Sequence, residues 1–402
     1  MLTLDSVYKA SHVLKEVIRH TDLIKAPKIS TDCEIYLKPE NLQVTGSFKV
    51  RGAYYKISQL TEEEKAKGVI ACSAGNHAQG VALAASKAGI KSLICLPDGA
   101  PISKVEATKS YGAEVCLVPG VYDDAYNKAL SLRDEKGYTF IHPFDDENVI
   151  AGQGTIGLEI LDDLPDVDAV LVPIGGGGLI SGVAFAIKQL NPKVKVYGVQ
   201  AAGAPSMYNS LKDGKIERLD SVATLADGIA VKEPGTNTFE LCSKYVDEVV
   251  TVTEDEISSA ILTLIEQQKL ISEGAGAVSV AAAMFRKELP LKGKKVVCVV
   301  SGGNIDVTIL NRVIRRGLVK SGRSGMLNIE LVDKPGQLVG VSQIIASHGG
   351  NVTTVRHERA DENPDINGCF LRIQLETRNS AHLEEIRKAL IDEGYKLVDY
   401  IK

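Results

Sequence analysis

The run Ala169-Val-Leu-Val-Pro-Ile-Gly-Gly-Gly-Gly-Leu179 joins an apolar segment of strand length to four consecutive glycines. Residues 179–190, which follow, have the spacing of an amphipathic helix. A strand that is buried on both faces has a nearly continuous apolar sequence, as residues 169–174 do. This stretch therefore predicts a strand, a tight turn and a helix, within a parallel sheet that helices cover on both sides.

The same alternation of short apolar runs and helical stretches recurs on both sides of this unit. Strands are predicted at residues 69–72, 92–96, 114–118, 194–200 and 295–301, and helices at 76–88, 103–111 and 122–136. The pattern predicts two open, twisted α/β sheets. We expect a smaller one in residues 45–140 and a larger one in 141–320, with residues 1–44 packed on the larger.

After residue 320 the pattern changes. Residues 321–325 (Ser-Gly-Arg-Ser-Gly) are predicted to be a linker, and residues 326–402 a separate module. Its predicted strands are 326–332, 351–359, 368–376 and 396–401, and its predicted helices are 337–347 and 380–393, with Ser380 as the cap of the second. The order βαββαβ is that of a small ferredoxin-like module.

Composition excludes several classes of protein. The chain has 402 residues, 44% of them hydrophobic, and a formal net charge of −5, which argues against a nucleic-acid binder. Apolar runs fall short of the ~18 residues of a membrane span. The seven cysteines are scattered without CxxC spacing, so we expect no disulfide framework or zinc site and a cytoplasmic location.

The four glycines form a candidate phosphate site. Gly175, Gly176, Gly177 and Gly178 stand between a predicted strand and a predicted helix. Backbone N–H groups without side chains can approach a phosphate closely there, and the helix dipole adds a favourable potential. The run matches neither the GxGxxG dinucleotide pattern nor a P-loop.

A lysine supplies the second part of a candidate cofactor site. Lys49 lies in Gly46-Ser-Phe-Lys-Val-Arg-Gly52, which is too apolar and glycine-rich for an exposed helix. A desolvated lysine has a lowered pKa and becomes a nucleophile for an aldehyde. An aldehyde that also carries a phosphate is pyridoxal 5'-phosphate (PLP). Phe48 is a candidate to pack near the ring of this cofactor, although a core position is an equal interpretation.

Two further turns follow predicted strands. Ser73-Ala-Gly-Asn-His77 opens a helix, where backbone N–H groups suit a carboxylate and Asn76 can bind a phenolic oxygen without carrying charge. Ser301 begins Ser301-Gly-Gly-Asn304. A serine facing a pyridine nitrogen leaves that nitrogen unprotonated, which favours elimination over transamination. Ordinary helix capping is the alternative interpretation of both turns.

These motifs, in this order, resemble the threonine dehydratases (threonine ammonia-lyases), which are fold-type II PLP enzymes of the tryptophan synthase β type. The resemblance extends over residues 5–320 and includes Ala151-Gly-Gln-Gly-Thr-Ile-Gly-Leu-Glu159. The C-terminal module, with Asp333-Lys-Pro-Gly-Gln-Leu338, is similar to an ACT domain, a regulatory unit that often binds amino acids.

The resemblance implies a role for each candidate residue. Lys49 holds PLP as a Schiff base and takes the substrate Cα proton. The substrate carboxylate lies in the loop formed by Ser73, Ala74, Gly75, Asn76 and His77. The cofactor also contacts the four glycines, Ser301 and the backbone of Gly228. L-Threonine yields 2-oxobutanoate and ammonia, and L-serine yields pyruvate.

Four positions bear on how far the resemblance extends. Serine racemases of this family carry a second serine where this chain has Ala74, so we expect little racemisation. Gln200 and Ser206 stand where those relatives carry acidic ligands, so no divalent metal site is expected, while a monovalent cation stays open. Glu273 matches a family carboxylate near the site, and a structural salt bridge is an equal interpretation.

Alternatives to a threonine dehydratase are a serine dehydratase or racemase-like enzyme, a β-replacement enzyme or threonine synthase, and an amino-acid sensor whose PLP domain is inactive. The ACT resemblance implies allosteric regulation and a homodimer or homotetramer. Isoleucine and valine are both compatible effectors, the absence of any effector is equally compatible, and biosynthetic and catabolic roles both fit.

Overall fold

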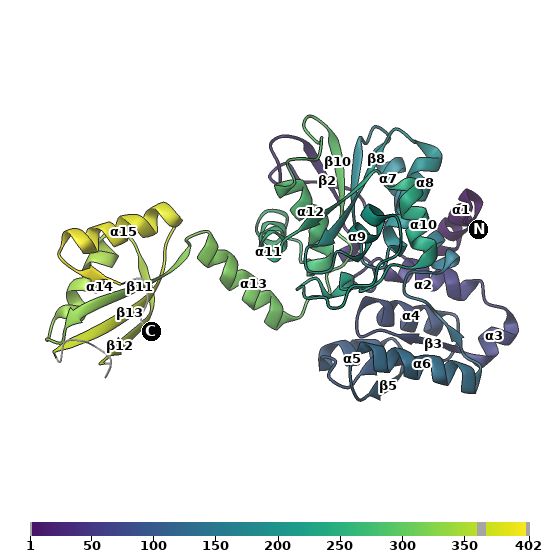
Figure 1. Ribbon diagram of the computed structural model, residues 1–402, viewed down its shortest axis with the longest axis horizontal. Coiled ribbons are helices and arrows are strands. Elements are labelled where there is room, and N and C mark those ends of the chain that lie inside the picture. The colour runs from purple at the N-terminus through teal and green to yellow at the C-terminus, as the bar shows by residue number, and fades with distance from the viewer. Residues whose placement is uncertain (1, 360–366, 399–402) are drawn as a thin grey trace. The chain divides into compact units, whose positions relative to one another are not determined.

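The computed structural model describes residues 2–359 and 367–398. Contacts divide the chain into two units, Met1–Asp306 and Val307–Lys402. The first unit contains the two predicted α/β sheets, and the second contains the predicted ferredoxin-like module (Figure 1).

The larger sheet of the first unit has six strands in the order β1-β2-β10-β7-β8-β9. They are β1 (Ile24–Lys25), β2 (Glu34–Lys38), β10 (Lys295–Val299), β7 (Ala169–Pro173), β8 (Lys195–Ala201) and β9 (Glu248–Val252). All neighbours run parallel except β1, which pairs antiparallel with β2. Strand β7 is buried at every position, as its continuous apolar sequence predicted.

The smaller sheet has four parallel strands in the order β5-β4-β3-β6. They are β5 (Glu114–Val118), β4 (Ser92–Pro97), β3 (Val69–Cys72) and β6 (Thr139–Phe140). In Figure 1 this sheet is seen with α4 (Asn76–Lys87), α5 (Ile102–Ser110) and α6 (Tyr122–Lys136) around it. The prediction of two parallel sheets with helical connections is confirmed.

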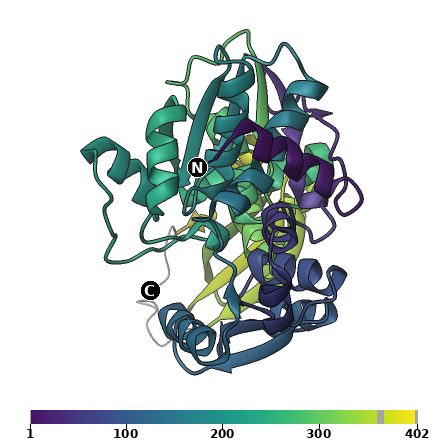
Figure 2. The same ribbon diagram turned by 90° about the vertical axis from the view of Figure 1, so that its right-hand side faces the viewer.

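The remaining helices of the first unit surround the larger sheet or join the two sheets. They are α1 (Leu4–Leu14), α2 (Lys49–Ser58), α3 (Glu62–Lys67), α7 (Glu147–Asp163), α8 (Gly178–Leu190), α9 (Ser206–Asp213), α10 (Thr236–Tyr245), α11 (Glu254–Thr263) and α12 (Gly274–Phe285), with short turns η1 (Glu40–Leu42), η2 (Asp227–Ile229) and η3 (Leu264–Gln268). Figure 2 shows α1, in purple, against the outside of this unit, where its buried residues pack on α7 and α8.

Helix α7 contains the glycine-rich run 151–159, and these glycines allow close helix packing. A Cβ on Gly152 would lie 2.6 Å from the Cα of Gly52 in α2. At the same contact Arg51 of α2 is fully buried and binds two carboxylates, Glu40 at 2.7 Å and Glu159 at 2.5 Å. This packing fixes α2, and therefore its first residue Lys49, against the rest of the unit.

The second unit forms an antiparallel sheet in the order β12-β13-β11-β14. Its elements are α13 (Val307–Lys320), β11 (Ser324–Val332), α14 (Gln337–Ser347), β12 (Asn351–Glu358), β13 (Gly368–Glu376), α15 (Ser380–Asp392) and β14 (Lys396–Leu397). From β11 onward the order is βαββαβ, as predicted, and helix α14 has the predicted limits. Its core includes Val341, Ile345 and Ile386, all fully buried.

Some limits differ from the sequence-based prediction. Asn379, rather than Ser380, caps α15, because its side-chain oxygen accepts the His382 N–H at 3.0 Å. Strand β11 begins at Ser324, inside the stretch 321–325 predicted as a linker. Helix α13 groups by its contacts with the second unit. The last predicted strand, 396–401, extends beyond the described residues after its first part, β14.

Candidate active site

Two loops that are far apart in the sequence pair with each other and bring the candidate residues together. The Phe48 N–H donates to the Ser301 carbonyl at 3.1 Å, and the Gly303 N–H donates to the Gly46 carbonyl at 2.9 Å. Ser47 forms an isolated antiparallel bridge with Gly302 between them. The carboxyl end of β10 therefore lies directly against the start of α2, where Lys49 stands.

Lys49 is held by a main-chain oxygen rather than by a carboxylate. Its Nζ donates to the Pro143 carbonyl at 2.8 Å and lies 5.2 Å from the centre of the Phe48 ring. Among residues 2–359 and 367–398 the structure gives it no ion pair. Burial lowers the pKa of Lys49 to about 8, against an opposing influence of Glu273. The lowered pKa increases the fraction of this amine that is neutral near pH 7 and able to act as a nucleophile.

The four glycines lead into α8, in which Gly177 is the cap residue and Gly178 the first helical residue, and no side chain caps this helix start. Gly177 has a φ of 99°, a conformation that favours glycine, and a Cβ there would lie 2.7 Å from Thr238. A Cβ on Gly176 would lie 2.5 Å from the Phe144 ring. The Thr238 hydroxyl donates to the Gly176 carbonyl at 2.6 Å, which holds the loop in place. The backbone N–H groups of the first turn are available to an anion.

The loop after β3 places Gly75, without a side-chain cap, before α4. The Ser73 hydroxyl accepts the Gly75 N–H at 3.1 Å, so neither Ser73 nor Asn76 serves as the simple cap considered above. A Cβ on Gly75 would meet no atom within 4 Å, so this backbone faces open space. Ala74 packs partly against the core of the smaller sheet.

His77 is placed differently from the rest of this loop. Its ring is buried, and Nε2 lies 2.8 Å from the Ile141 carbonyl, which requires an N–H at this nitrogen. Burial, with a further contribution from the Lys49 charge, lowers the pKa of His77 to about 3. The side chain is therefore neutral and structural, while the backbone of His77 remains at the helix start.

Asn76 lies between two side chains from distant parts of the chain. Its Nδ2 donates to Glu273 Oε1 at 2.6 Å, and its Oδ1 accepts Asn304 Nδ2 at 2.8 Å. Glu273 forms no ion pair among the described residues, so the salt-bridge interpretation was wrong. Burial and Asp227 raise the pKa of Glu273 to about 7, although Asn76, Lys104 and Lys49 oppose this rise.

Gly228 and Ser301 complete the predicted set. A Cβ on Gly228 would lie 3.5 Å from Glu273 Oε1, which places this backbone at the same carboxyl group. The Ser301 side chain is buried, and its hydroxyl donates to the Ala275 carbonyl at 3.3 Å. No helix begins at Ser301, because the chain continues without a regular element to α13, so it is not a cap.

Residues 14–302 match the model of the family described as "Pyridoxal-phosphate dependent enzyme". The chain belongs to this family. It is 53% identical to an L-threonine ammonia-lyase of Thermotoga maritima over 99% of both chains, and 48% identical to an L-threonine ammonia-lyase of Geobacter sulfurreducens over 100% of both. It is also similar in structure to processed threonine deaminase isoform 2 of Solanum lycopersicum, with a TM-score of 0.74, 41% identity and coverage of 77% of this chain and 88% of that one.

In this PLP-dependent enzyme, sequence reasoning missed the segment around Pro143 and Phe144. Its carbonyl groups hold Lys49 and His77, and its aromatic ring covers Gly176. The segment carries no motif, and the His-Pro-Phe triplet at 142–144 was its only local signal. Asn304 is the last residue of the turn that begins at Ser301. Its contact with Asn76 could not be predicted from sequence spacing, because the two residues are far apart in the chain.

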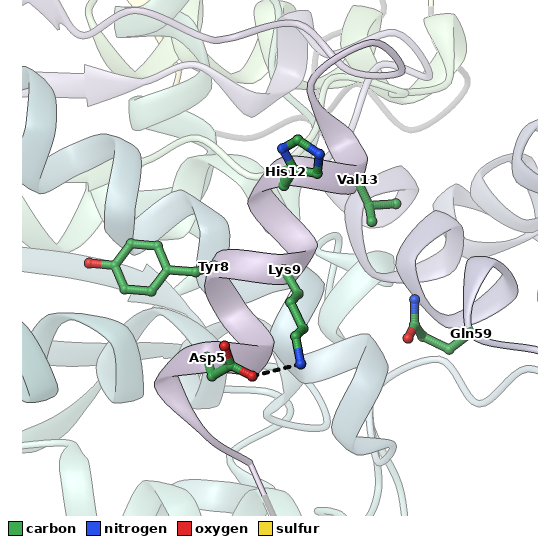
Figure 3. A pocket seen from close by; sticks show the side chains of 6 residues that line it. All are labelled: Asp5, Tyr8, Lys9, His12, Val13 and Gln59. Atoms are coloured by element: carbon green, nitrogen blue, oxygen red, sulfur yellow. Dashed lines mark ion pairs between the residues drawn. The ribbon is translucent and has the colours of Figure 1, made fainter.

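A shallow groove of the PLP-dependent enzyme lies on α1, away from these residues. Its volume is about 410 Å³, and it is lined by Asp5, Tyr8, Lys9, His12, Val13 and Gln59 (Figure 3). Lys9 and Asp5 form an exposed ion pair across one turn of the helix. None of the candidate active-site residues lines this groove.

Among the described residues, no helix has the length and apolar character needed to cross a membrane.

Proposed function

We propose that this enzyme is an L-threonine ammonia-lyase, which converts L-threonine to 2-oxobutanoate and ammonia and acts on L-serine as a second substrate to give pyruvate. The observation that carries the proposal is the 53% identity to an L-threonine ammonia-lyase over nearly the whole of both chains. The arrangement around Lys49 supports it independently, since a partly neutral amine lies in the same unit as an uncapped, glycine-rich helix start.

The residues present fit PLP. The four glycines would hold the phosphate through their backbone N–H groups. Glycine is needed at 176 and 177, because side chains there would occupy space that Phe144 and Thr238 already fill. Lys49 would bind the aldehyde carbon, and Phe48, Asn76, Gly228 and Ser301 would surround the ring. When bound, the cofactor supplies an electron-withdrawing ring that stabilises negative charge at the substrate Cα.

The chain's own groups would then bind the substrate and move its protons. The backbone of residues 73–77 would hold the substrate carboxylate at the start of α4, where the open space beside Gly75 leaves room for it. Lys49 Nζ, with its pKa lowered by burial, would take the proton from Cα. The neutral Ser301 hydroxyl would favour loss of the β-hydroxyl over transamination, since it places no negative charge at the ring nitrogen.

A serine racemase-like activity is the second candidate, because the fold is also similar to maize serine racemase, with a TM-score of 0.75 and 34% identity over 79% of this chain and 98% of that one. Racemisation needs a proton donor on each face of the substrate. Ala74 has no ionisable group to serve the second face. The structure therefore supports elimination better than racemisation.

For the chain as a whole we propose a catalytic domain in residues 1–320 and a regulatory ACT domain in 326–402, joined by the segment 321–325, of which the last two residues already belong to β11. The sheet order β12-β13-β11-β14 leaves β12 as an edge strand, whose unpaired side suits assembly into a homodimer or homotetramer. Isoleucine or valine would be the effector. Seven free cysteines are consistent with a reducing cytoplasm.

Release of 2-oxo acid from L-threonine and L-serine by the purified protein with added PLP tests the catalytic proposal. Formation of 2-oxobutanoate from threonine is expected, with slower pyruvate formation from serine. No product from either substrate, despite bound cofactor, would contradict it and favour the sensor alternative.

The same assay with isoleucine and with valine, repeated on a chain truncated at Ser321, tests the regulatory part. An unchanged effector response and subunit number after truncation would reject that part.

A further inference from the structure

The orientation of the Asn76 amide follows from a chain of hydrogen bonds that begins at a main-chain oxygen. The Thr45 carbonyl accepts Asn304 Nδ2 at 2.8 Å. A carbonyl can only accept, so the amide nitrogen of Asn304 must face Thr45. The same nitrogen donates to Asn76 Oδ1 at 2.8 Å. The oxygen of Asn76 therefore faces Asn304, and its nitrogen faces Glu273 Oε1 at 2.6 Å.

One N–H of Asn76 remains for a ligand. A primary amide nitrogen carries two hydrogens, and Glu273 accepts one of them. No residue in the described part of the chain accepts the other. A Cβ on Gly302 would lie 3.0 Å from Asn76 Nδ2, so the glycine at 302 keeps the space beside this nitrogen free of a side chain. Glu273 is also near enough to Lys49 for each charge to influence the other.

We infer that Asn304 and Glu273 are positioning residues, which hold the Asn76 amide with its nitrogen, and not its oxygen, toward a ligand oxygen in the Lys49 site. The inference rests on the proposed function in one respect, that PLP binds beside Lys49, and its phenolic oxygen is the acceptor that Asn76 would meet. A flipped amide would place its nitrogen against the Asn304 nitrogen, which loses that hydrogen bond, and its oxygen against Glu273, where a hydrogen bond forms only when the carboxyl is protonated.

Reversing the donor at position 304 tests this directly. In Asn304→Asp the ionised side chain can only accept, so Asn76 is expected to turn its nitrogen toward residue 304 and its oxygen toward the ligand. The dissociation constant of PLP, measured by titrating the apoprotein and following visible absorbance, should rise about tenfold or more, the loss expected for one hydrogen bond. The absorption maximum of the bound cofactor should also shift, because the donor to its phenolic oxygen is removed.

Asn41→Asp is the matched control. Asn41 is buried, whereas Asn304 is half-buried, but Asn41 likewise donates to a backbone carbonyl (Ile271, 2.9 Å) and lies beside Gly303. Among the described residues it forms no hydrogen bond with Asn76. Its change should lower the thermal stability and leave the absorption maximum unaltered. Asn304→Ala, which introduces no charge, should fall between the wild type and Asn304→Asp, and it decides the question if Asn304→Asp does not fold.

The two glutamate variants separate the acceptor from the charge. Glu273→Gln still offers an oxygen to Asn76 and should bind PLP within about twofold of the wild type, whereas Glu273→Ala should weaken it about tenfold. A folded Asn304→Asp protein with the wild-type dissociation constant and absorption maximum would overturn the inference. These readouts use PLP alone, so they test the inference even if the wild type proves inactive on threonine. An enzyme that deaminates threonine without depending on Asn304 would contradict the inference and leave the proposed function standing.

Discussion

The Lys104 ammonium lies 2.7 Å from the Asp227 carboxylate and joins α5, on the smaller sheet, to η2, beside the larger sheet. The two residues act in opposite directions on the buried Glu273 carboxyl. Asp227 raises the pKa of Glu273, while Lys104 lowers it. The ion pair therefore moderates the acidity of the group that accepts a hydrogen bond from Asn76.

Lys104→Met should move a titration in the active site to higher pH. Lys104 lowers the pKa of Glu273, and Asp227 raises it. When the Lys104 cation is removed, the pKa of Glu273 should therefore rise above its value of about 7 in the wild type. The pH dependence of kcat/KM, measured from pH 5.5 to 9, should show its Glu273-dependent inflection displaced upward. Glu273→Gln should remove that inflection. Lys109→Met, which breaks an exposed ion pair on the same helix, is the control and should leave the profile in place.

Lys49→Ala should abolish 2-oxo acid formation, by more than about 10³-fold, because the chain loses both the amine that binds the aldehyde and the base for the Cα proton. The visible absorbance of the lysine-bound cofactor should disappear as well. Lys56→Ala changes another lysine of α2, one that pairs with Asp146, and should keep the absorbance. Near-normal turnover by Lys49→Ala would remove this lysine from the mechanism.

Gly46→Ala should disturb the pairing of the two active-site loops. Gly46 has a φ of 69°, which costs a non-glycine residue about 1–3 kcal/mol, and its new Cβ would lie 2.5 Å from Asn304 Oδ1. Gly214→Ala isolates the backbone contribution, because Gly214 has a φ of 68° and no atom within 4 Å of the new Cβ. In urea unfolding Gly46→Ala should be the more destabilising by about 1 kcal/mol or more, and only Gly46→Ala should weaken PLP binding. Equal losses in the two variants would contradict the close contact.

Arg51→Met should lower the free energy of unfolding by about 3–5 kcal/mol, because Glu40 and Glu159 would keep buried charges without their main partner. Arg133→Met, at an exposed ion pair, should change it by less than about 1 kcal/mol.

Acid should also lower the free energy of unfolding. Burial raises the pKa of Glu159, but Arg51 and Lys38 outweigh this and hold it below the ordinary value. Its contribution to stability is therefore present above the unfolded-state pKa and is lost as the pH falls through the lowered one.

Local sequence patterns predicted most of the elements, because each strand and helix carries its own periodicity. Strands β3 and β5 and helices α6 and α14 have the predicted limits. The continuous apolar run of β7 also identified the parallel sheet, and the glycines after it marked the uncapped start of α8. Lys49 and the Ser73–His77 turn were found from the composition of their immediate neighbours.

What local patterns could not predict depends on which distant segments meet. The apolar sequence of β10 identified a strand, but nothing in it shows that β10 lies between β2 and β7. The pairing of residues 46–48 with 301–303 follows from that placement, and so do the contacts of Asn304. Pro143 was missed for a related reason, since it contributes only a backbone carbonyl, which no residue type reveals.

The central position of β10 has a consequence for a chain that is still being synthesised. This strand is the last of the first unit to leave the ribosome, yet it completes the middle of the larger sheet and brings Ser301 against Phe48. A nascent chain that stops before residue 304 lacks the contacts of Ser301 and Asn304 with Phe48 and Asn76, so we expect cofactor loading to follow completion of the unit. Holoenzyme formation would then report that folding of this unit has finished.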